Sequence, residues 1–316
     1  MRIIQTAAAV PPQRVTNSDL AALMPTTDAW ITSRTGIRTR HVATTQTNYD
    51  LALAVATQLL ATSDYTAADL DFILVATMSP DYQTPGVANR VQGALGAVNA
   101  LACDLNAACA GFVYGLEVAA GQLARGAQAG LVIGSEVLSS LLDWTDRSTA
   151  VLFGDGAAGV LVTAAGPAPL SRLRSFGQDA MQLTAGGRTN HSPFAQTPAL
   201  APAFAMNGRA VYHFATTTVA DEVLALLATA GLAPTAVDGY YVHQANVRII
   251  QSLAKRLGVA PERLPHNLAE YGNTSAASVP LLLHDARMSG RLTDGQQIIL
   301  CGFGGGLNVA AMLLTT

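Results

Sequence analysis

The sequence predicts an α/β fold built from two related halves, and three observations support this prediction. The chain has 316 residues, of which 50% are hydrophobic and 12% charged, so it can bury a large core. Patterns of short buried strands alternate with helical patterns, which is typical of α/β proteins. Part of the first half also recurs in the second half, which indicates an internal duplication.

The duplication begins with a helix, a turn and a strand. The sequence Leu-Leu-Ala-Thr at 59–62 recurs at 226–229, and a buried strand pattern follows in each copy, at 70–75 and at 237–242. In the same register, the segment around Cys109 falls opposite the segment after Asn273, and each leads into a helical pattern. We therefore expect equivalent ends of the two halves to meet at a central seam.

We place the boundary near Ala165, which gives an N-terminal half of residues 1–165 and a C-terminal half of residues 166–316. Each half closes with a Gly-rich turn before a strand. Residues 166–203 are rich in Gly, Pro and polar residues, and we expect them to connect the halves and run over the surface. Residues 154–159 also fit the G-x-G-x-x-G pattern of dinucleotide sites, but a strand pattern follows where that site needs a helix, so this interpretation is rejected.

Composition and charge exclude several classes of protein. No apolar run is long enough to span a bilayer and the N-terminus lacks a signal-peptide pattern, so we expect a cytoplasmic protein that does not bind membranes. The net charge of -3 disfavours nucleic-acid binding. The three cysteines, Cys103, Cys109 and Cys301, are odd in number and lack metal-ligand spacing, which predicts a reducing compartment and no metal site. Lys255 is the only lysine, which disfavours Schiff-base chemistry.

Cys109 is the first candidate for a reactive group. Residues 101–105 read as a short buried strand and a helical pattern starts at Gly111, so Cys109 is predicted at a strand-to-helix junction. Free N–H groups and the helix dipole at such a junction favour a thiolate. The small neighbours of Cys109 permit a tight turn and a close approach of a substrate carbonyl. Cys103, on the strand, is expected to be a buried structural residue.

His243 and Asn273 are the next two candidates. His243 ends the apolar run 240–242, and Asn273 lies in a Gly-Asn-Thr-Ser segment that is also suited to a turn or a helix cap. Taken alone, each of these residues also fits a structural role. Together with Cys109, they predict a cysteine nucleophile served by a histidine and an asparagine. The Gly-rich segment 302–306 offers backbone N–H groups that can polarise a thioester oxygen, or forms a plain hairpin turn.

These segments, in this order, resemble the β-ketoacyl-(acyl carrier protein) synthase III family of the thiolase superfamily. The resemblance rests on residues 30–31, 34–38, 108–112, 154–156, 243–246, 272–277 and 302–306, and so covers essentially the whole chain. It implies a five-layered αβαβα fold, a homodimer and no metal or redox cofactor. It also implies the condensation that initiates fatty-acid synthesis: an acyl group from acyl-coenzyme A is loaded onto cysteine, then joined to malonyl-acyl carrier protein with loss of carbon dioxide.

The resemblance assigns roles to the three reactive residues. Cys109 would be the nucleophile, and His243 and Asn273 would stabilise the enolate that decarboxylation leaves. Backbone N–H groups of Cys109 and, in the terminal turn, Gly305 would hold the acyl oxyanion. The acyl group would be transferred first to the Cys109 thiol and then to the malonyl unit, which is covalent catalysis.

The resemblance also implies a path for coenzyme A. Trp30 and Arg147 would flank the adenine, Arg34 would lie near the phosphates, and Gly208 and Asn246 would line the pantetheine path. Where family members often carry a bulky Phe in the acyl pocket, this chain has Thr84, for which we expect a longer or wider pocket that admits primers beyond acetyl.

A docking surface is suggested by the charges on the helix predicted after His243. Arg248, Lys255 and Arg256 share one face of that helix, and Arg209 is expected to extend the group. Most such groups are only solvated helix faces. Here the single lysine lies beside arginines, which suggests docking of an acidic carrier protein.

Three rival functions remain to be weighed. A papain-type hydrolase also uses Cys, His and Asn in this order, but residues 106–110 lack its sequence context around the cysteine. Related enzymes of secondary metabolism condense or transfer coenzyme A thioesters on the same fold, and the sequence does not separate them. The presence of Asn273 disfavours two other classes of the superfamily, the chain-elongating condensing enzymes with a Cys-His-His set of reactive residues and the thiolases with a Cys-His-Cys set. A non-enzymatic protein of this fold would be expected to lack one of the three reactive residues.

Overall fold

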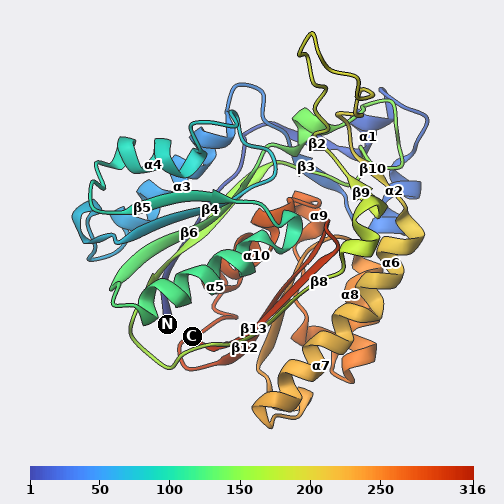
Figure 1. Ribbon diagram of the computed structural model, residues 1–316. Coiled ribbons are helices and arrows are strands. Elements are labelled where there is room, and N and C mark those ends of the chain that lie inside the picture. Colours follow the sequence, from blue (N-terminus) through green and yellow to red (C-terminus); the bar gives the residue numbers. More distant parts are fainter.

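The computed structural model describes residues 1–316 and contains two mixed β-sheets with helices against their faces (Figure 1). The first sheet has the strand order β1-β7-β6-β4-β5 and the second has the order β11-β12-β13-β8. The first is formed by β1 (Arg2–Ala9), β4 (Phe72–Ala76), β5 (Leu101–Leu105), β6 (Ala129–Glu136) and β7 (Gly156–Thr163). The second is formed by β8 (Leu170–Ser175), β11 (Gly239–Val242), β12 (Gln297–Gly304) and β13 (Asn308–Thr315).

The remaining elements are helices and two small ribbons, in which β2 (Arg14–Thr16) pairs with β3 (Thr39–His41) and β9 (Leu183–Thr184) with β10 (Ala205–Met206). The α-helices are α1 (Asn17–Ala21), α2 (Asp28–Thr35), α3 (Asn48–Ala61), α4 (Val87–Leu95), α5 (Gly111–Ala124), α6 (Gly208–Thr216), α7 (Thr218–Ala230), α8 (Val247–Leu257), α9 (Leu268–Tyr271) and α10 (Ser278–Met288). The 3-10 helices are η1 (Ala67–Asp69), η2 (Ala108–Ala110), η3 (Leu138–Leu141), η4 (Gly177–Gln182), η5 (Pro234–Ala236), η6 (Pro261–Arg263) and η7 (Ser275–Ala277).

Strand β4 shows why the sheets are covered on both faces. Alternate residues of a strand point to opposite sides. Phe72 and Leu74 belong to the core around α5 and α10, whereas Ile73 and Val75 belong to the core under α3 and α4. With both faces buried, the strand is a continuous apolar run, as is usual for the parallel strands of α/β proteins.

The layers follow from this packing. Helices α5 and α10 lie between the two sheets, α3 and α4 cover the outer face of the first, and α7 and α8 cover the outer face of the second (Figure 1). The result is the predicted αβαβα order of layers, and the predicted fold class is confirmed. No helix combines the length and the apolar character needed to cross a bilayer.

The two halves repeat the same succession of elements. Helix α3, η1 and β4 correspond to α7, η5 and β11, as the repeated Leu-Leu-Ala-Thr segments predict. Further along, η2 and α5 correspond to η7 and α10. The N-termini of the two buried helices therefore meet at the centre, where η2 and η7 are in contact.

Two local predictions differ from the structure. Strand β5 pairs only with β4, so it is an edge strand, and Cys103 on it is exposed rather than buried. The connecting segment 166–203 also contains β8, a strand of the second sheet, which its polar composition did not indicate. The exposed part of that segment leads from β9 toward β10 and projects at the top of Figure 1.

Candidate active site

Cys109 lies in the short turn η2 immediately before the central helix α5. Its neighbour Ala108 has a φ of 47°, a left-handed conformation that L-residues adopt rarely and that turns the chain sharply into the helix. The side chain of Cys109 is buried, with 7% of its surface exposed, and it lines the main cavity. The predicted junction of strand, turn and helix is therefore present.

Strand β12 passes directly against this thiol. A Cβ at Gly304 would lie 2.9 Å from Cβ and 3.0 Å from Sγ of Cys109, and a Cβ at Gly302 would lie 2.7 Å from Cα of Ala110. Such distances leave no room for a side chain. The next residue, Gly305, is the one expected from the sequence to be a backbone donor to the acyl oxyanion. The N–H of Gly305 makes no hydrogen bond within the protein, and its carbonyl accepts from Nδ2 of Asn308 at 2.8 Å.

His243 follows β11 and is held on two sides. Its Nδ1 lies 2.6 Å from Oγ of Ser278, and its ring meets the edge of Phe303 at a centroid distance of 5.2 Å. Oγ of Ser278 also donates to the carbonyl oxygen of Ser275 at 2.8 Å, which fixes the hydroxyl beside the ring. Burial lowers the pKa of His243 to about 3, which keeps the ring neutral.

Asn273 is fixed by its main chain and by its side-chain oxygen. Its N–H donates to the carbonyl of Leu152 at 2.8 Å, and its carbonyl accepts from Gly154 at 3.0 Å. Its Oδ1 accepts from the N–H of Ser275 at 2.9 Å. This bond orients the side chain, and the NH₂ group of Asn273 makes no hydrogen bond within the protein and is available to a ligand.

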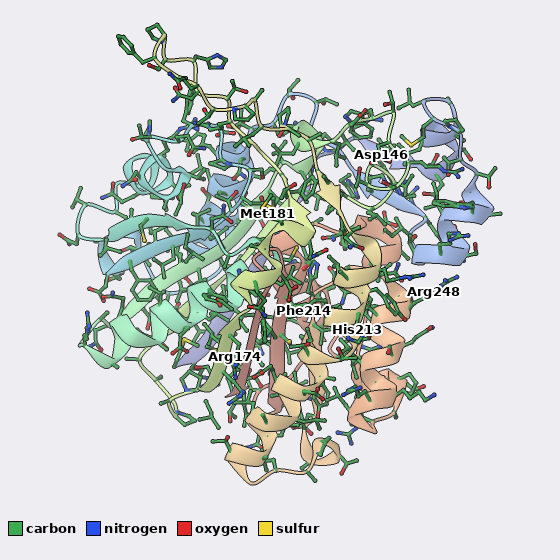
Figure 2. All side chains as sticks on the ribbon, turned by 45° about the vertical axis from the view of Figure 1, so that its right-hand side comes forward. Asp146, Arg174, Met181, His213, Phe214 and Arg248 are labelled. Carbon is green, nitrogen blue, oxygen red and sulfur yellow. The ribbon has the colours of Figure 1, made fainter.

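One cavity of about 720 Å³ brings the three candidates together, since Cys109, His243 and Asn273 all line it. Its wall is mainly apolar and includes Phe204, Val211 and Phe214. Phe214 on α6 and Arg248 on α8 also line the cavity, and Figure 2 shows that these two helices lie side by side. A long apolar cavity with a few converging polar groups suits an acyl chain and its thioester.

The electrostatics of the thiol differ from the sequence-based expectation. The N-terminus of α5 was expected to favour a thiolate, but burial dominates and raises the pKa of the Cys109 thiol to about 12. A hydrogen bond from Ser275 and the N–H of Cys109 itself oppose this rise without overcoming it. The resting side chain is therefore a neutral thiol that must lose its proton during the reaction.

Of the residues expected to bind coenzyme A, Arg34, Gly208 and Asn246 line the cavity, whereas Trp30 lies beside Arg34, and Arg147 beside Trp30, outside it. The guanidinium carbons of Arg34 and Arg147 lie 5.0 Å and 5.1 Å from the ring centroid of Trp30. A nucleobase stacked between Trp30 and Arg147 needs roughly 7 Å, twice the usual contact distance, so Arg147 has to move outward. Gly208 begins α6 and Asn246 caps α8, and both line the cavity.

The structure also locates the remaining predicted residues. Thr84 is exposed on the loop before α4 and does not line the cavity of its own chain, so its effect on the acyl pocket stays a prediction. In the predicted docking surface, Arg209 and Arg248 line the cavity mouth, whereas Lys255 and Arg256 are exposed near the end of α8. Arg256 also pairs with Asp221 at 2.8 Å, which reduces the free positive charge there.

Sequence reasoning missed three polar residues of the site. Ser275 and Ser278 hold Asn273 and His243, and Glu136 is a fully buried carboxylate behind Cys109. The spacing of the serines at the start of a helix was a usable signal for the first two. Nothing in the sequence around Glu136, at the end of a strand, distinguished it from a solvent-exposed residue.

Known proteins are similar to this chain over its whole length. Residues 103–177 match the family profile described as 3-oxoacyl-[acyl-carrier-protein (ACP)] synthase III, and residues 227–316 match the profile of its C-terminal part. A β-ketoacyl-[acyl-carrier-protein] synthase III of Lactobacillus helveticus is 48% identical over 320 residues, covering 99% of this chain and 98% of the relative. One of Levilactobacillus brevis is 48% identical over 318 residues, covering 99% and 97%.

Solved structures agree with these relatives. The 3-oxoacyl-[acyl-carrier-protein] synthase III of Aquifex aeolicus superposes with a TM-score of 0.92 at 37% identity, covering 99% of both chains. A priming β-ketosynthase of a polyketide biosynthetic pathway gives a TM-score of 0.92 at 32% identity, covering 99% of this chain and 96% of that one. On these similarities and the cavity geometry, the chain belongs to the β-ketoacyl-[acyl-carrier-protein] synthase III family of the thiolase superfamily.

Proposed function

We propose that this protein catalyses the decarboxylating condensation of an acyl-coenzyme A primer with malonyl-acyl carrier protein, the reaction that initiates fatty-acid synthesis. The observation that supports it most directly is the meeting of Cys109, His243 and Asn273 in one apolar cavity. Relatives that are 48% identical over nearly the whole chain carry the name of this synthase.

In the first step, Sγ of Cys109 attacks the thioester carbonyl of the primer. A new S–C bond forms, the bond to the coenzyme A sulfur breaks, and coenzyme A leaves as a thiol, so that the proton lost by the Cys109 thiol is balanced by the proton that the coenzyme A sulfur gains. The free N–H of Gly305, with that of Cys109, stabilises the oxyanion in this proposal, which is supported by the close approach of the preceding residue, Gly304, to the sulfur. One donor of this kind contributes about 3 kcal/mol.

In the second step, malonyl-acyl carrier protein enters the same cavity. Nε2–H of His243 and the NH₂ group of Asn273 donate to its thioester oxygen, which becomes an enolate oxygen as carbon dioxide leaves. The enolate carbon attacks the acyl-cysteine and releases the sulfur. Because the pKa of His243 is about 3, the ring acts as a neutral donor.

Coenzyme A and the acyl carrier protein bind in this proposal through residues at and near the cavity. Trp30 and Arg147 stack on the adenine, Arg34 lies near the phosphates, and Gly208 and Asn246 contact the pantetheine arm. Arg209 and Arg248 form the part of the docking surface nearest the cavity, and Lys255 and Arg256 the more distant part. Charge reversal at Arg248 is expected to raise KM for the malonyl carrier without changing KM for acyl-coenzyme A.

The active form is a homodimer in this proposal, and strand β5 supports it. As an edge strand it presents unpaired backbone groups, and Leu101 on it is 50% exposed and Val98 before it 80%. Light scattering coupled to gel filtration tests the dimer, and Ala102→Pro, which removes a backbone donor from this strand, is expected to weaken it.

The priming β-ketosynthase of the polyketide pathway supports a second candidate, a starter condensation in secondary metabolism. This chain is 32% identical to that ketosynthase but 48% identical to the β-ketoacyl-[acyl-carrier-protein] synthase III of Lactobacillus helveticus, which favours the first function. The deciding experiment incubates the protein with acetyl-coenzyme A and malonyl-acyl carrier protein and measures the product by mass spectrometry. A β-ketoacyl carrier protein supports the proposal, whereas acyl transfer or hydrolysis without condensation refutes it.

A further inference from the structure

The turn that carries Gly305 has little in its own sequence to hold it in shape. Gly305 and Gly306 follow Gly304 between β12 and β13, and a glycine has no side chain to restrict its backbone. The φ of Gly306 is 126°, a conformation that other residues rarely adopt. An oxyanion is stabilised by donors that already point at it, so this turn needs an outside support if it is to serve acyl transfer.

Asn308 supplies a bond to the middle of this turn. Its Nδ2 donates to the carbonyl of Gly305 at 2.8 Å. A carbonyl only accepts, so the NH₂ group of Asn308 must face Gly305 and its Oδ1 must face away. The side chain is folded over Gly306, where a Cβ would come within 2.1 Å of Nδ2 of Asn308. The glycine at position 306 therefore leaves the room that this bond requires.

Strand β8 holds the other side of the Asn308 amide. Oγ of Ser175 lies 2.7 Å from Oδ1 of Asn308, and because that oxygen only accepts, Ser175 is the donor. The next residue, Phe176, donates its main-chain N–H to the carbonyl of Leu307 at 2.8 Å. The end of β8 thus supports the turn at two points.

The register of the second sheet places these side chains beside the thiol. Gly304 pairs with Asn308 across β12 and β13, and Asn308 pairs with Ser175 across β13 and β8 (Figure 1). Residues that pair directly across antiparallel strands point to the same face of a sheet. A Cβ at Gly304 would lie 3.0 Å from Sγ of Cys109, so Asn308 and Ser175 continue a row that begins at the thiol.

Gly305 itself packs against the turn of the nucleophile. A Cβ on Gly305 would lie 3.2 Å from Cβ of Ala108, the residue before Cys109, and the N–H of Gly305 has no partner within the protein. The N–H and the carbonyl of Gly305 lie on either side of one Cα. The bond to Asn308 fixes the carbonyl, and the pairing of Gly304 fixes the chain before it, so together they limit the direction of this N–H.

We propose that Asn308, oriented by Ser175, is a positioning residue that keeps the Gly305 N–H directed at the thioester oxygen during acyl transfer to Cys109. This inference rests on the proposed function. Neither Asn308 nor Ser175 lines the cavity, so both act through the peptide that they hold. Without the bond from Asn308, the glycine turn adopts other conformations and the oxyanion loses part of one donor.

The first test measures acetylation of Cys109 by acetyl-coenzyme A without malonyl carrier, by acid quench and intact-protein mass spectrometry. Asn308→Ala is expected to slow the maximal rate about 10-fold to about 100-fold, less than the loss of a whole donor. Ser175→Ala is expected to slow it less, and the double variant to be no slower than Asn308→Ala, because the two residues act on one bond. The concentration of acetyl-coenzyme A that gives half the maximal rate is expected to stay the same.

Asn308→Asp gives the test a pH signature. The introduced carboxylate cannot donate to the carbonyl of Gly305, whereas its protonated form can. The acetylation rate of this variant, divided by that of the unmodified protein, is expected to rise several-fold as pH falls from about 8 to about 5. Asn308→Ala introduces no titrating group, so its ratio should stay constant. Gln128→Glu is the matched control, because Nε2 of Gln128 donates to the carbonyl of Gly126 at 2.8 Å in an exposed segment away from the cavity; it is expected to match the unmodified protein.

Alkylation by iodoacetamide separates positioning from a general effect on the site. This reaction consumes the Cys109 thiol without forming an oxyanion, so the Asn308 and Ser175 variants are expected to be alkylated on the Cys109 peptide at the unmodified rate. Normal alkylation with slowed acetylation supports the proposal. Equal slowing of both reactions, unchanged acetylation, or a constant ratio for Asn308→Asp overturns it. If the unmodified protein itself forms no acetyl-enzyme, the proposed function fails instead.

Discussion

Ala108 and Ser275 occupy equivalent positions in the two halves, and both have a φ of 47°. Each begins the 3-10 turn that precedes a central helix, α5 in one half and α10 in the other. In the first half this turn places Cys109 at the cavity, and in the second the main-chain N–H of Ser275 holds Oδ1 of Asn273, which lines the same cavity. The duplication therefore places the candidate nucleophile in one copy and Asn273 beside the equivalent turn of the other.

The contact between Ser278 and His243 predicts an effect confined to decarboxylation. Ser278→Ala removes the group that contacts Nδ1, so the orientation of the His243 ring is no longer fixed. A lost hydrogen bond of about 1–3 kcal/mol slows carbon dioxide release from the malonyl carrier about 10-fold to about 100-fold. Acetylation of Cys109 should continue at its normal rate. Slowing of both steps alike would contradict the separation of roles.

The close approach of β12 to Cys109 predicts a steric effect at one glycine. Gly304→Ala places a Cβ about 3 Å from the sulfur, and acetylation is expected to fall about 100-fold or more. Gly305→Ala meets Cβ of Ala108 at 3.2 Å and Cδ2 of Leu183 at 3.4 Å but keeps its N–H, so its effect is expected to be smaller. Gly93→Ala faces open space on α4 and serves as the control. Equal rates for Gly304→Ala and the control would show that the packing at the thiol is looser than described.

The buried imidazole predicts a pH dependence of stability. The pKa of His243 is about 3 in the folded protein against 6.5 in an unfolded chain, so between these values the unfolded state binds more protons. The stabilisation due to the neutral ring is present above about pH 6.5 and is lost as pH falls toward 3. His243→Gln does not titrate, so its stability relative to the unmodified protein should improve on acidification by up to about 1.4 kcal/mol per pH unit. Urea unfolding at several pH values measures this, and a constant difference would contradict it.

The buried Glu136 predicts a pH dependence of folding stability with the opposite sign. Its pKa is raised from 4.5 to about 7, so its protonated form favours the folded state. This contribution is complete below about pH 4.5 and is lost as pH rises through 7. The stability of Glu136→Gln relative to the unmodified protein should therefore improve as pH rises over that range. Unfolding curves that show no such change would indicate a normally titrating carboxyl.

The stacked group at the cavity mouth predicts a binding effect that depends on the nucleotide. Loss of stacking on a base costs about 1–3 kcal/mol, so Trp30→Ala should raise KM for acetyl-coenzyme A about 10-fold or more. KM for a short acetyl thioester without the nucleotide should not change. The two substrates are compared in steady-state assays, and an equal rise for both would place Trp30 outside the nucleotide site.

Much of the fold was predictable because its signals are local or repeated. The Leu-Leu-Ala-Thr repeats at 59–62 and 226–229 lie in α3 and α7, and the strand patterns after them form β4 and β11. Strand β8 was not predicted because it lies at the edge of its sheet, where its residues are partly exposed to solvent, and because its sequence is polar. Which strand lies at an edge depends on pairing, so the exposure of Cys103 was not predictable. The boundary near Ala165 stays a prediction.

The candidate site was predictable only in its reactive residues. Cys109, His243 and Asn273 stand at element ends in recognisable segments, and the structure brings them to one cavity. The protonation of the thiol was not predictable, because burial outweighs the helix dipole and burial is a property of the assembled halves. Glu136 was missed for the same reason, since its contacts come from β4, η7 and the turn of Cys109. The role of Thr84 in the acyl pocket stays a prediction, because this residue is exposed on the loop before α4.

The most direct test of the central claim is the fate of an acetyl group offered as acetyl-coenzyme A. Mass spectrometry of digested protein should find acetyl on the peptide that contains Cys109, none in Cys109→Ala, and transfer to an acetoacetyl carrier protein when the malonyl carrier is added. An unmodified Cys109 peptide, or an acetyl group that leaves only by hydrolysis in the presence of the malonyl carrier, would contradict the account.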